Sequence, residues 1–462
     1  MPTRRDFAKK MFTTSLASSA LARSAPGQAS PSDTINLAVV GFRGRGRAHY
    51  NAFGRIPGVR IAYLCDVDER LFPQALDEVE KINGHRPKTE TDIRRLLERQ
   101  DLDAISIATP DHWHALMTIW GCQAGKDVYV EKPCSYTLWE GRKMVEAARK
   151  YNRIVQVGLN RRSSARTRVA MEFVREKQFG ATYRAKAVIY RGRASIGRVQ
   201  EASIPQGVNW DLYLGPAPYR AFSLNRFHYG WHFFSDTSTH EMGNNGVHAL
   251  DVVRWGLAKN VHPVRIHCTG GQFGEKSDSE VPDVQVGTFE YEDGTLVEVD
   301  TTTLYSPPFG GVHMGEFFYT DRGYVSSEGR WKTVQGKFTP RDEPDLPGGV
   351  SLRASNLSFP RIEYTDGPAI PDGAEDDEGS EQRGSHFQNF VDCVRSRERS
   401  NLHCEIEEGH LSTSLCHLAN ISFRTNRKLV FDPKTETFPG DEEANGWLRR
   451  TYREPYVVPE NV

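Results

Sequence analysis

The chain has 462 residues, more than one ordinary hydrophobic core covers, so two domains are the default expectation. Its 59 basic and 60 acidic residues nearly cancel, which excludes the charge excess typical of proteins that bind nucleic acid or an anionic membrane surface. Hydrophobic residues make up 38% and charged residues 26%, as in globular proteins, and no stretch after the N-terminus is long and apolar enough to predict a membrane span.

The first residues have the pattern of an export signal. Arg4 and Arg5 form a twin-arginine pair, the mildly apolar run Met11–Leu21 follows, and Ala20–Ala22 has the small residues of a cleavage site. We therefore expect residues 1–33 to be a signal peptide followed by an extended arm. The protein is then expected to be periplasmic or secreted through twin-arginine export.

Seven cysteines are dispersed along the chain without C-x-x-C spacing. Twin-arginine export carries proteins that have already folded, and the odd number of thiols does not fit a disulfide framework. We expect the cysteines to be buried and to act as small hydrophobic residues.

A strand, a glycine-rich turn and a helix start follow one another at the beginning of the folded part. Ile35–Val40 is rich in apolar β-formers, glycines occupy positions 41, 44 and 46, and a helical pattern begins at Ala48. Glycine allows positive φ and lets a phosphate approach the backbone, where exposed N–H groups and the helix dipole bind it. This order is typical of a dinucleotide-binding site.

The next strand, Val59–Leu64, leads to Asp66, which lies about 20 residues after the last glycine of the turn. An acidic residue at this distance binds the adenosine ribose and would repel a 2′-phosphate. The sequence therefore predicts NAD as the cofactor, with NADP less favoured. Arg43 occupies the middle position of the G-x-G-x-x-G pattern, and Arg43 and Arg45 could partly offset the repulsion of NADP.

Helices and strands alternate through the remainder of this region, which predicts a doubly wound parallel sheet of the Rossmann type over residues 34–158. Thr137 and Glu140 have the spacing of a capping box at a helix start. The expected helices are 69–83 (interrupted by Pro73), 91–99, 113–124 and one beginning at 137. The further expected strands are 104–108, 127–130 and 154–158.

After residue 160 the strands become longer, and Glu292–Gly294 has the residues of a hairpin turn. We expect an α+β domain over 159–435, with a large, open, mainly antiparallel sheet and helices on one face, and a tail over 436–462. Segment 342–384 is rich in proline, glycine and acidic residues and is expected to be a surface excursion. The expected strands are 183–190, 264–270, 284–291, 295–302 and 428–431, and the expected helices are 163–178, 386–395 and 407–424.

Four more segments support a resemblance to a known family. Thr109–His112 follows the third strand, and Glu131–Pro133 follows the fourth, at the edge where open parallel sheets bind ligands. Gln156–Arg162 and Trp210–Pro218 are two further segments of this kind. Together with the glycine turn they are similar to the glucose-fructose oxidoreductase, inositol dehydrogenase and MocA family, over roughly residues 35–435.

The resemblance implies that Lys132 lies beside the reacting hydroxyl and that His248 is the catalytic histidine, whereas Asn244 stands where the family has an aspartate. A histidine with a pKa of about 6.5 suits the removal of a hydroxyl proton near neutrality. Asn244 can orient His248 but cannot stabilise an imidazolium as a carboxylate would. The residues expected to bind the cofactor are Gly41, Phe42, Arg43, Gly44, Arg45, Gly46, Asp66, Thr109, Pro110, His112, Glu131 and Lys132.

Four histidines, at positions 228, 232, 240 and 248, suggest a metal site. Because their spacing matches no tight ligand motif, no metal is expected. A polar sugar pocket explains this region better, with aromatic faces and hydrogen-bonding groups together. Core packing of the aromatic residues is the alternative. The residues expected to bind the substrate are Asn160, Arg161, Tyr229, Trp231, Asn245 and His248.

The combined expectation is an exported NAD-dependent oxidoreductase that acts on a secondary hydroxyl of a sugar, glycoside or cyclitol. One alternative is a glycosidase that works by transient oxidation and elimination with bound NAD; the chain lacks the Tyr-Pro-Thr-His type of segment associated with those enzymes. Another is a nucleotide-bound protein without turnover. We also expect a homo-oligomer, a dimer or tetramer built on the open sheet face, because a large uncovered sheet exposes apolar area.

Overall fold

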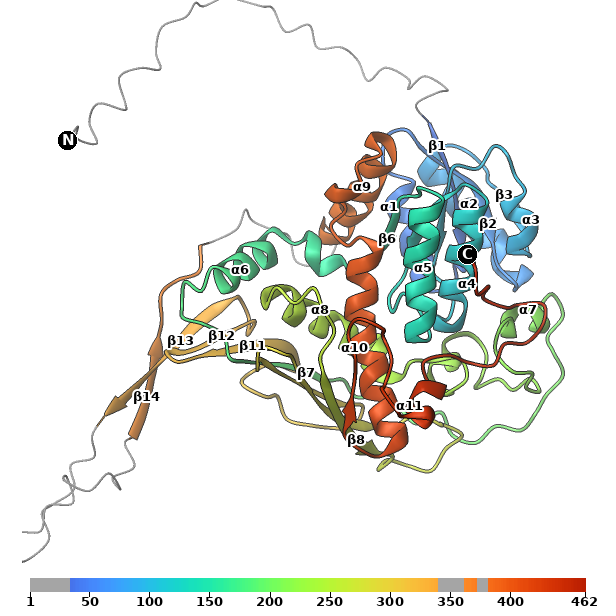
Figure 1. Ribbon diagram of the computed structural model, residues 1–462. Coiled ribbons are helices and arrows are strands. Elements are labelled where there is room, and N and C mark those ends of the chain that lie inside the picture. The colour runs from blue at the N-terminus through green and yellow to red at the C-terminus, as the bar shows by residue number, and fades with distance from the viewer. Residues whose placement is uncertain (1–33, 340–360, 372–380) are drawn as a thin grey trace, which may run out of the picture. The chain divides into compact units, whose positions relative to one another are not determined.

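The computed structural model describes residues 34–339, 361–371 and 381–462. The expected signal peptide and arm, 1–33, lie outside the described residues, as do large parts of the expected surface excursion. The residues from Ile35 onward belong to one compact unit that contains two β-sheets (Figure 1).

The first sheet has six parallel strands in the order β3-β2-β1-β4-β5-β6, which is the strand order of a Rossmann domain. It confirms the predicted doubly wound parallel sheet. Ala38 of β1 pairs with Tyr63 on one side and with Ile105 on the other, so the glycine turn leaves the centre of the sheet. The strands are β1 (Ile35–Val40), β2 (Val59–Cys65), β3 (Lys88–Glu90), β4 (Ala104–Ile107), β5 (Asp127–Val130) and β6 (Val155–Val157).

Helix α1 begins at Arg45, three residues before the start that the apolar pattern predicts. The glycine turn is shorter than the sequence pattern indicates. Gly41 adopts a φ of 75°, and a Cβ on Gly46 would lie 1.9 Å from the carbonyl oxygen of Gly41. Thr137 and Glu140 form the predicted capping box. The helices of this half are α1 (Arg45–Phe53), α2 (Phe72–Asn83), α3 (Ile93–Leu97), α4 (Asp111–Gln123) and α5 (Leu138–Lys150).

The second sheet has nine strands in the order β14-β13-β12-β11-β7-β10-β9-β8-β15. It is mainly antiparallel, as predicted, but its central pair β7 and β10 is parallel. The strands are β7 (Arg184–Tyr190), β8 (Arg265–Gly271), β9 (Val284–Glu290), β10 (Leu296–Thr302), β11 (Met314–Thr320), β12 (Gly323–Ser326), β13 (Lys332–Thr339), β14 (Arg361–Asp366) and β15 (Leu429–Val430).

The sequence did not indicate strands β11 to β14. β14 lies inside the segment expected to be a surface excursion, so that expectation was wrong for Arg361–Asp366, which pairs with β13 along its whole length. Tyr364 is 62% exposed. An edge strand with exposed side chains on both faces has no burial-driven alternation, and its pairing is visible only in three dimensions.

Helices α8 and α10 pack against one face of the second sheet, and α6 packs on α8 (Figure 1). Helix α6 is shorter than expected because residues Asn160–Ser163 form a 3₁₀ turn and the side chain of Ser164 caps the helix. The helices are α6 (Ala165–Arg175), α7 (Trp210–Leu214), α8 (Val247–Gly256), α9 (Glu381–Ser396), α10 (Ile406–Thr425) and α11 (Glu442–Gly446).

Helix α9, late in the chain, returns to the first sheet. Phe387 and Phe390 pack their rings against Phe53 of α1 and Tyr129 of β5. All seven cysteines are buried and unpaired, which confirms the expected role of the thiols. Among the described helices, none combines the length and the apolar character that crossing a membrane requires.

Candidate active site

A cavity of about 340 Å³ opens at the carboxyl ends of the parallel strands. Residues from the glycine turn, from the ends of β2, β4 and β5, and from the segment 212–244 line it. The predicted site residues on its wall are Gly41, Arg43, Gly44, Arg45, Asp66, Thr109, Pro110, Glu131, Lys132, Tyr229, Trp231 and Asn244. The predicted site residues that are absent from this wall are Phe42, Gly46, His112, Asn160, Arg161, Asn245 and His248.

Asp66 has the geometry of a ribose-binding carboxylate. Its Oδ2 accepts the backbone N–H of Phe42 at 3.0 Å and its Oδ1 that of Asp68 at 3.1 Å. Burial raises the pKa of Asp66 to about 6, although these N–H groups oppose the rise. A Cβ on Gly44 would meet no protein atom, so the backbone beside the cavity is open to a phosphate. These residues fit a dinucleotide.

Arg45 crosses from the start of α1 to the end of β5. Its Nε donates to Oε1 of Glu131 at 2.7 Å, and Nε2 of His49 lies 3.0 Å from the same oxygen. Burial opposes the ionisation of Glu131, but Arg45 and His49 hold the pKa of Glu131 well below its usual range. The sequence did not indicate His49, which lies on the buried side of α1 and also contacts Ser106 at 2.8 Å.

Lys132 precedes a cis peptide bond to Pro133 and is held by Asn244. Its Nζ donates to the backbone oxygen of Asn244 at 2.7 Å and to Oδ1 at 3.1 Å. Asn244 lies in a short π-helical turn, Met242–Gly246, a conformation frequent at functional sites. Burial lowers the pKa of Lys132. The two contacts leave one hydrogen-bonding position of Nζ for a substrate oxygen.

His248 follows the π-helical turn on α8 and is not part of the cavity wall. Its Nδ1 is buried and has no hydrogen-bond partner among the described residues. Burial, followed by the charge of Lys132, lowers the pKa of His248 well below its usual value. Its role as the base therefore stays a prediction.

Three predicted polar residues bind the protein itself. Arg161 forms an ion pair with the buried Glu316 of β11, donating from Nη2 to Oε2 at 2.9 Å. Asn245 donates to Glu241. His112 Nε2 donates to the backbone oxygen of Tyr213 at 3.1 Å. Their side chains hold the walls of the site together.

Glu241 and Arg193 were missed by the sequence analysis. Glu241 is buried, accepts a hydrogen bond from Nε of Arg193 at 2.7 Å, and lies 3.2 Å from Nε2 of His232. Arg193 also donates from Nη1 to the hydroxyl of Tyr229 at 3.1 Å. Burial opposes the ionisation of Glu241, but His232 and Arg193 lower the pKa of Glu241 to about 2. Glu241 lies between two of the histidines and three residues before Asn244, and this position was the signal in the sequence that could have identified it.

A segment of the second half closes over the cofactor side of the cavity. The backbone N–H of Asn209 donates to Val67 at 2.8 Å, and that of Glu69 donates to Gly207 at 2.8 Å. His228 Nε2 lies 3.1 Å from Oδ2 of Asp68. Residues 207–228, which we call the strap, are therefore fixed to the end of β2. Leu212 and Tyr213 of the strap line the cavity.

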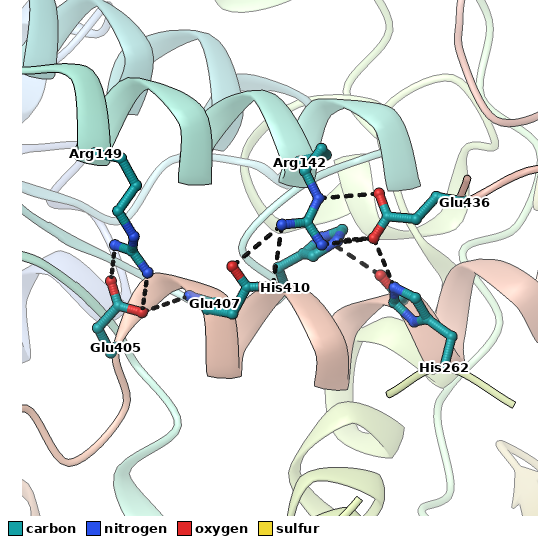
Figure 2. Close-up of polar contacts among 8 residues, drawn as sticks. Arg142, Arg149, His262, Glu405, Glu407, His410 and Glu436 are labelled. Carbon is teal, nitrogen blue, oxygen red and sulfur yellow. Dashed lines mark hydrogen bonds and ion pairs between the residues drawn. The ribbon is translucent and has the colours of Figure 1, made fainter. Parts of the chain in front are cut away.

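One group of the described residues brings three potential metal ligands together, away from this cavity: His262, His410 and Glu436 (Figure 2). The two Nε2 atoms lie 2.7 and 2.9 Å from Oε1 of Glu436. Arg142 binds the same carboxylate with two hydrogen bonds, at 2.6 and 3.0 Å. Because a guanidinium already occupies the oxygen that a cation would need, the cluster is an ion-pair network.

Two family models match the chain. One, described as an oxidoreductase family with an NAD-binding Rossmann fold, covers residues 35–159. The other, the C-terminal alpha/beta domain of the same oxidoreductase family, covers residues 182–305 and 368–458.

Among curated proteins, a glycosyl hydrolase family 109 protein of Shewanella baltica (strain OS195) is 28% identical over 159 residues, which is 34% of this chain and 35% of that protein. The chain thus spans about a third of the length of such relatives.

Solved structures of similar fold cover nearly the whole chain. The WlbA dehydrogenase of Bordetella pertussis, in complex with NADH and UDP-GlcNAcA, has a TM-score of 0.61 and 17% identity over 86% of this chain and 99% of that one. The aldose-aldose oxidoreductase of Caulobacter crescentus, complexed with glycerol, has a TM-score of 0.60 and 14% identity over 86% and 100%. With both of its halves matched by one family, the chain belongs to the Gfo/Idh/MocA oxidoreductases and carries their NAD-binding Rossmann domain.

Proposed function

We propose that this protein is an NAD-dependent oxidoreductase that acts on a secondary hydroxyl of a sugar, glycoside or cyclitol. The observation that carries the proposal is the single cavity in which the ribose carboxylate Asp66, the Lys132–Asn244 pair and the aromatic rings of Tyr229 and Trp231 meet. Apolar ring faces beside hydrogen-bonding groups suit the faces and hydroxyls of a sugar. Two solved structures of similar fold, the WlbA dehydrogenase with NADH and UDP-GlcNAcA and levoglucosan dehydrogenase with NADH and levoglucosan, support this substrate class.

Different residues along the cavity bind the cofactor and the substrate. The N–H groups of the glycine turn and Asp66 hold the dinucleotide. Bound NAD supplies the acceptor for the hydride that leaves the substrate carbon. Lys132, fixed by two hydrogen bonds to Asn244, donates to the substrate oxygen and stabilises the negative charge that develops there. Fixing Nζ before the substrate arrives reduces the ordering needed in the reaction.

A redox-neutral glycosidase is the second candidate, and two observations favour it. The curated relatives matched by the N-terminal part are named glycosyl hydrolase family 109 proteins. The strap is bonded across the cofactor side of the cavity, which favours a cofactor that stays bound and is restored in each cycle. Transient oxidation, elimination and re-reduction would use the same Lys132 and the same cavity.

One experiment separates the candidate functions. The purified protein, loaded with NAD, is incubated with a panel of sugars, glycosides and cyclitols while NADH absorbance and free sugar are both recorded. NADH that accumulates in proportion to added NAD supports the oxidoreductase, and sugar release without added NAD supports the glycosidase. Neither change, in a protein that binds NAD in a fluorescence titration, would favour a nucleotide-bound protein without turnover. Lys132→Ala is the matched inactive control.

We also propose that the chain is exported, on the evidence of Arg4 and Arg5. In a host with a twin-arginine pathway, the full chain should appear in the periplasmic fraction or the medium. The variant with both arginines changed to lysine should remain in the cytoplasm. An unchanged distribution of that variant would contradict the proposal.

A further inference from the structure

We infer that Tyr229 exchanges the proton with the substrate hydroxyl, and that Arg193 and Glu241 orient it for this task. The inference rests on the proposed oxidoreductase function and assigns the base within the same cavity. It gives Tyr229 the role that the family resemblance implies for His248. Lys132 keeps the role of holding the substrate oxygen.

Position is the first argument. Tyr229 lines the cavity together with Lys132 and Asn244, whereas His248 does not. The hydroxyl of Tyr229 lies 3.5 Å from Nδ2 of Asn244, whose Oδ1 accepts the hydrogen bond from Lys132. Only the amide of Asn244 therefore separates the phenol from the ammonium that is expected to bind the reacting oxygen.

The second argument is that other ionisable side chains on the cavity wall are already engaged by the protein. Asp111 accepts the backbone N–H of Thr239 at 3.0 Å and its hydroxyl at 2.6 Å. Both ring nitrogens of His114 lie within 2.8 Å of backbone oxygens, those of Pro133 and Thr109. Asp66, Glu131 and His228 have the partners described above. Among the described residues, the phenol of Tyr229 accepts hydrogen bonds but donates to no acceptor.

The third argument is electrostatic. The Tyr229 oxygen receives an N–H of Arg193 at 3.1 Å, and the guanidinium also lies 5.6 Å from the centre of the Tyr229 ring. Glu241, nearly fully buried, fixes Arg193 through Nε at 2.7 Å. A cation that donates to the phenol oxygen stabilises the phenolate that acts as the base. The ring of His232 stacks on that of Tyr229 with centres 5.7 Å apart, which sets the ring plane.

The step balances as follows. The phenolate oxygen of Tyr229 takes the proton from the substrate hydroxyl, the O–H bond breaks, and the carbonyl bond forms as the hydride pair leaves the carbon for bound NAD. The substrate is oxidised and NAD is reduced. Tyr229 is 50% exposed, so its new proton can pass to solvent before the next turnover. In the reverse direction the phenol returns the proton to the carbonyl oxygen.

The test compares Tyr229→Phe with Tyr305→Phe, a matched control at an exposed tyrosine that belongs neither to the cavity wall nor to the strap. We expect Tyr229→Phe to lower kcat by about 10² to 10⁴, the usual effect of a lost general base, with little change in KM or in NAD affinity. Tyr305→Phe should behave like the wild type in kcat, KM and NAD affinity.

Arg193→Gln tests the positioning role. Without the guanidinium the phenol is no longer held toward the substrate oxygen, so kcat should fall while KM and NAD affinity change little, and Arg193→Lys should restore part of the loss. The groups facing the phenol in these variants are Glu241, His232, Asn244 and Lys132. Folding is checked by the NAD affinity of each variant.

Full kcat in Tyr229→Phe would overturn the inference, as would a loss of turnover confined to His248→Gln. These results are distinct from a failure of the proposed function. If no sugar, glycoside or cyclitol of the panel is turned over by the wild-type protein, the function itself is wrong. If the wild-type protein converts a substrate of the panel and Lys132→Ala does not, the proposed function holds. The Tyr229 variants then test only which residue is the base.

Discussion

We expect Asp66 to determine both the preference for NAD and the pH dependence of NAD binding. Both carboxylate oxygens accept backbone N–H groups, yet burial raises its pKa to about 6. A ribose hydroxyl donates to the ionised carboxylate, and a 2′-phosphate is repelled by it. Arg45, which could have attracted that phosphate, is engaged by Glu131, whereas Arg43 is exposed on the cavity wall.

We expect the affinity for NAD to rise with pH through about 6 and then to level off. Binding favours the ionised carboxylate, so below this pH each unit should weaken binding by up to about tenfold. Fluorescence titrations between pH 5 and 8 measure this dependence. Asp66→Asn should bind NAD less tightly, lose the pH dependence, and accept NADP more readily. A flat wild-type profile, or a wild-type preference for NADP, would show the assignment to be wrong.

Residue positions that depend on local geometry were predictable, and those that depend on distant contacts were not. Gly41, Asp66 and Lys132 sit at fixed distances from strand ends, and the sequence placed all three on the cavity wall. Glu241 and Arg193 meet across 48 positions of the chain. No periodicity of either segment shows that contact, because it arises from the tertiary packing of two loops within the second half of the chain.

The strap is the element that closes the cofactor side. Besides its backbone hydrogen bonds to the end of β2, it receives hydrogen bonds from the side chains of α4, including that from Nε1 of Trp113 to Leu212 at 3.0 Å. Burial, followed by the charge of Arg43, lowers the pKa of His228 to about 4, so near neutrality the neutral imidazole donates a hydrogen bond from Nε2 to the carboxylate of Asp68. We expect these bonds to open when a bound dinucleotide leaves.

We expect His228→Ala to speed the dissociation of NAD several-fold while leaving the fold intact. The loss of one strap contact lowers the cost of opening by about the 0.5–1.5 kcal/mol of one hydrogen bond. Stopped-flow displacement of bound NADH measures the rate. His85→Ala, which removes an exposed histidine paired with Arg60, is the control. Equal dissociation rates in the wild type and His228→Ala would show that the strap does not limit release.

A second set of elements is joined by the ion-pair network around Arg142 (Figure 2). Arg142 of α5 binds Glu436, which follows β15, and Glu407 of α10 at 3.0 Å. His410 of α10 and His262, before β8, bind the same Glu436 carboxylate. One carboxylate thus connects the Rossmann helix α5 to the helix that covers the second sheet. Burial opposes its ionisation, but His262, His410 and Arg142 lower the pKa of Glu436.

We expect Glu436→Gln to lower the free energy of unfolding by about 1–3 kcal/mol at neutral pH, since it leaves buried donors without a charged acceptor. A carboxyl whose folded pKa is depressed contributes stability above its unfolded pKa, near about 4.3, and loses it as pH falls. The difference between wild type and variant in urea unfolding should therefore shrink in acid. Glu407→Gln, at a side chain 35% exposed, should cost less than about 1 kcal/mol. Stabilisation by Zn²⁺, or loss of stability with EDTA, would contradict an ion-pair network.

In the whole molecule, the sequence predicted the strands of the first sheet more completely than the strands of the second sheet. Five strands of the first sheet, β1, β2, β4, β5 and β6, are largely buried and alternate with helices, so the sequence predicted them, whereas the short and largely exposed β3 was missed. The second sheet has one covered and one open face, and its parallel pair β7 and β10 are more than 100 residues apart. Such long-range pairing leaves no mark in local periodicity, so the parallel pair was not predicted. Strands β11 to β13 pair with their neighbours in the sequence across short turns, and the sequence analysis missed them as well.

The open face of the second sheet is the surface through which the homo-oligomer is predicted to form. It carries Val286 and Leu296, which are 42% and 43% exposed, but also the ion pair between Arg184 and Glu298 at 3.4 Å. The face is therefore mixed rather than continuously apolar. Interfaces between folded subunits are commonly of this kind, with apolar contacts inside a polar rim. Because charged side chains such as Arg184 and Glu298 lie on this face, we expect association through it to depend on the salt concentration.

We expect the full chain to be at least a dimer by light scattering at micromolar concentration and low salt. Val286→Glu places a charge in the middle of the open face, opposite Asp300 of the neighbouring strand, and should shift the mass toward a monomer without changing NAD affinity. Val261→Glu makes the same change at an exposed valine in the loop before β8 and should leave the mass unchanged. A monomeric wild-type protein would refute the oligomer. A dimer that survives Val286→Glu but not changes elsewhere would place the interface on another face.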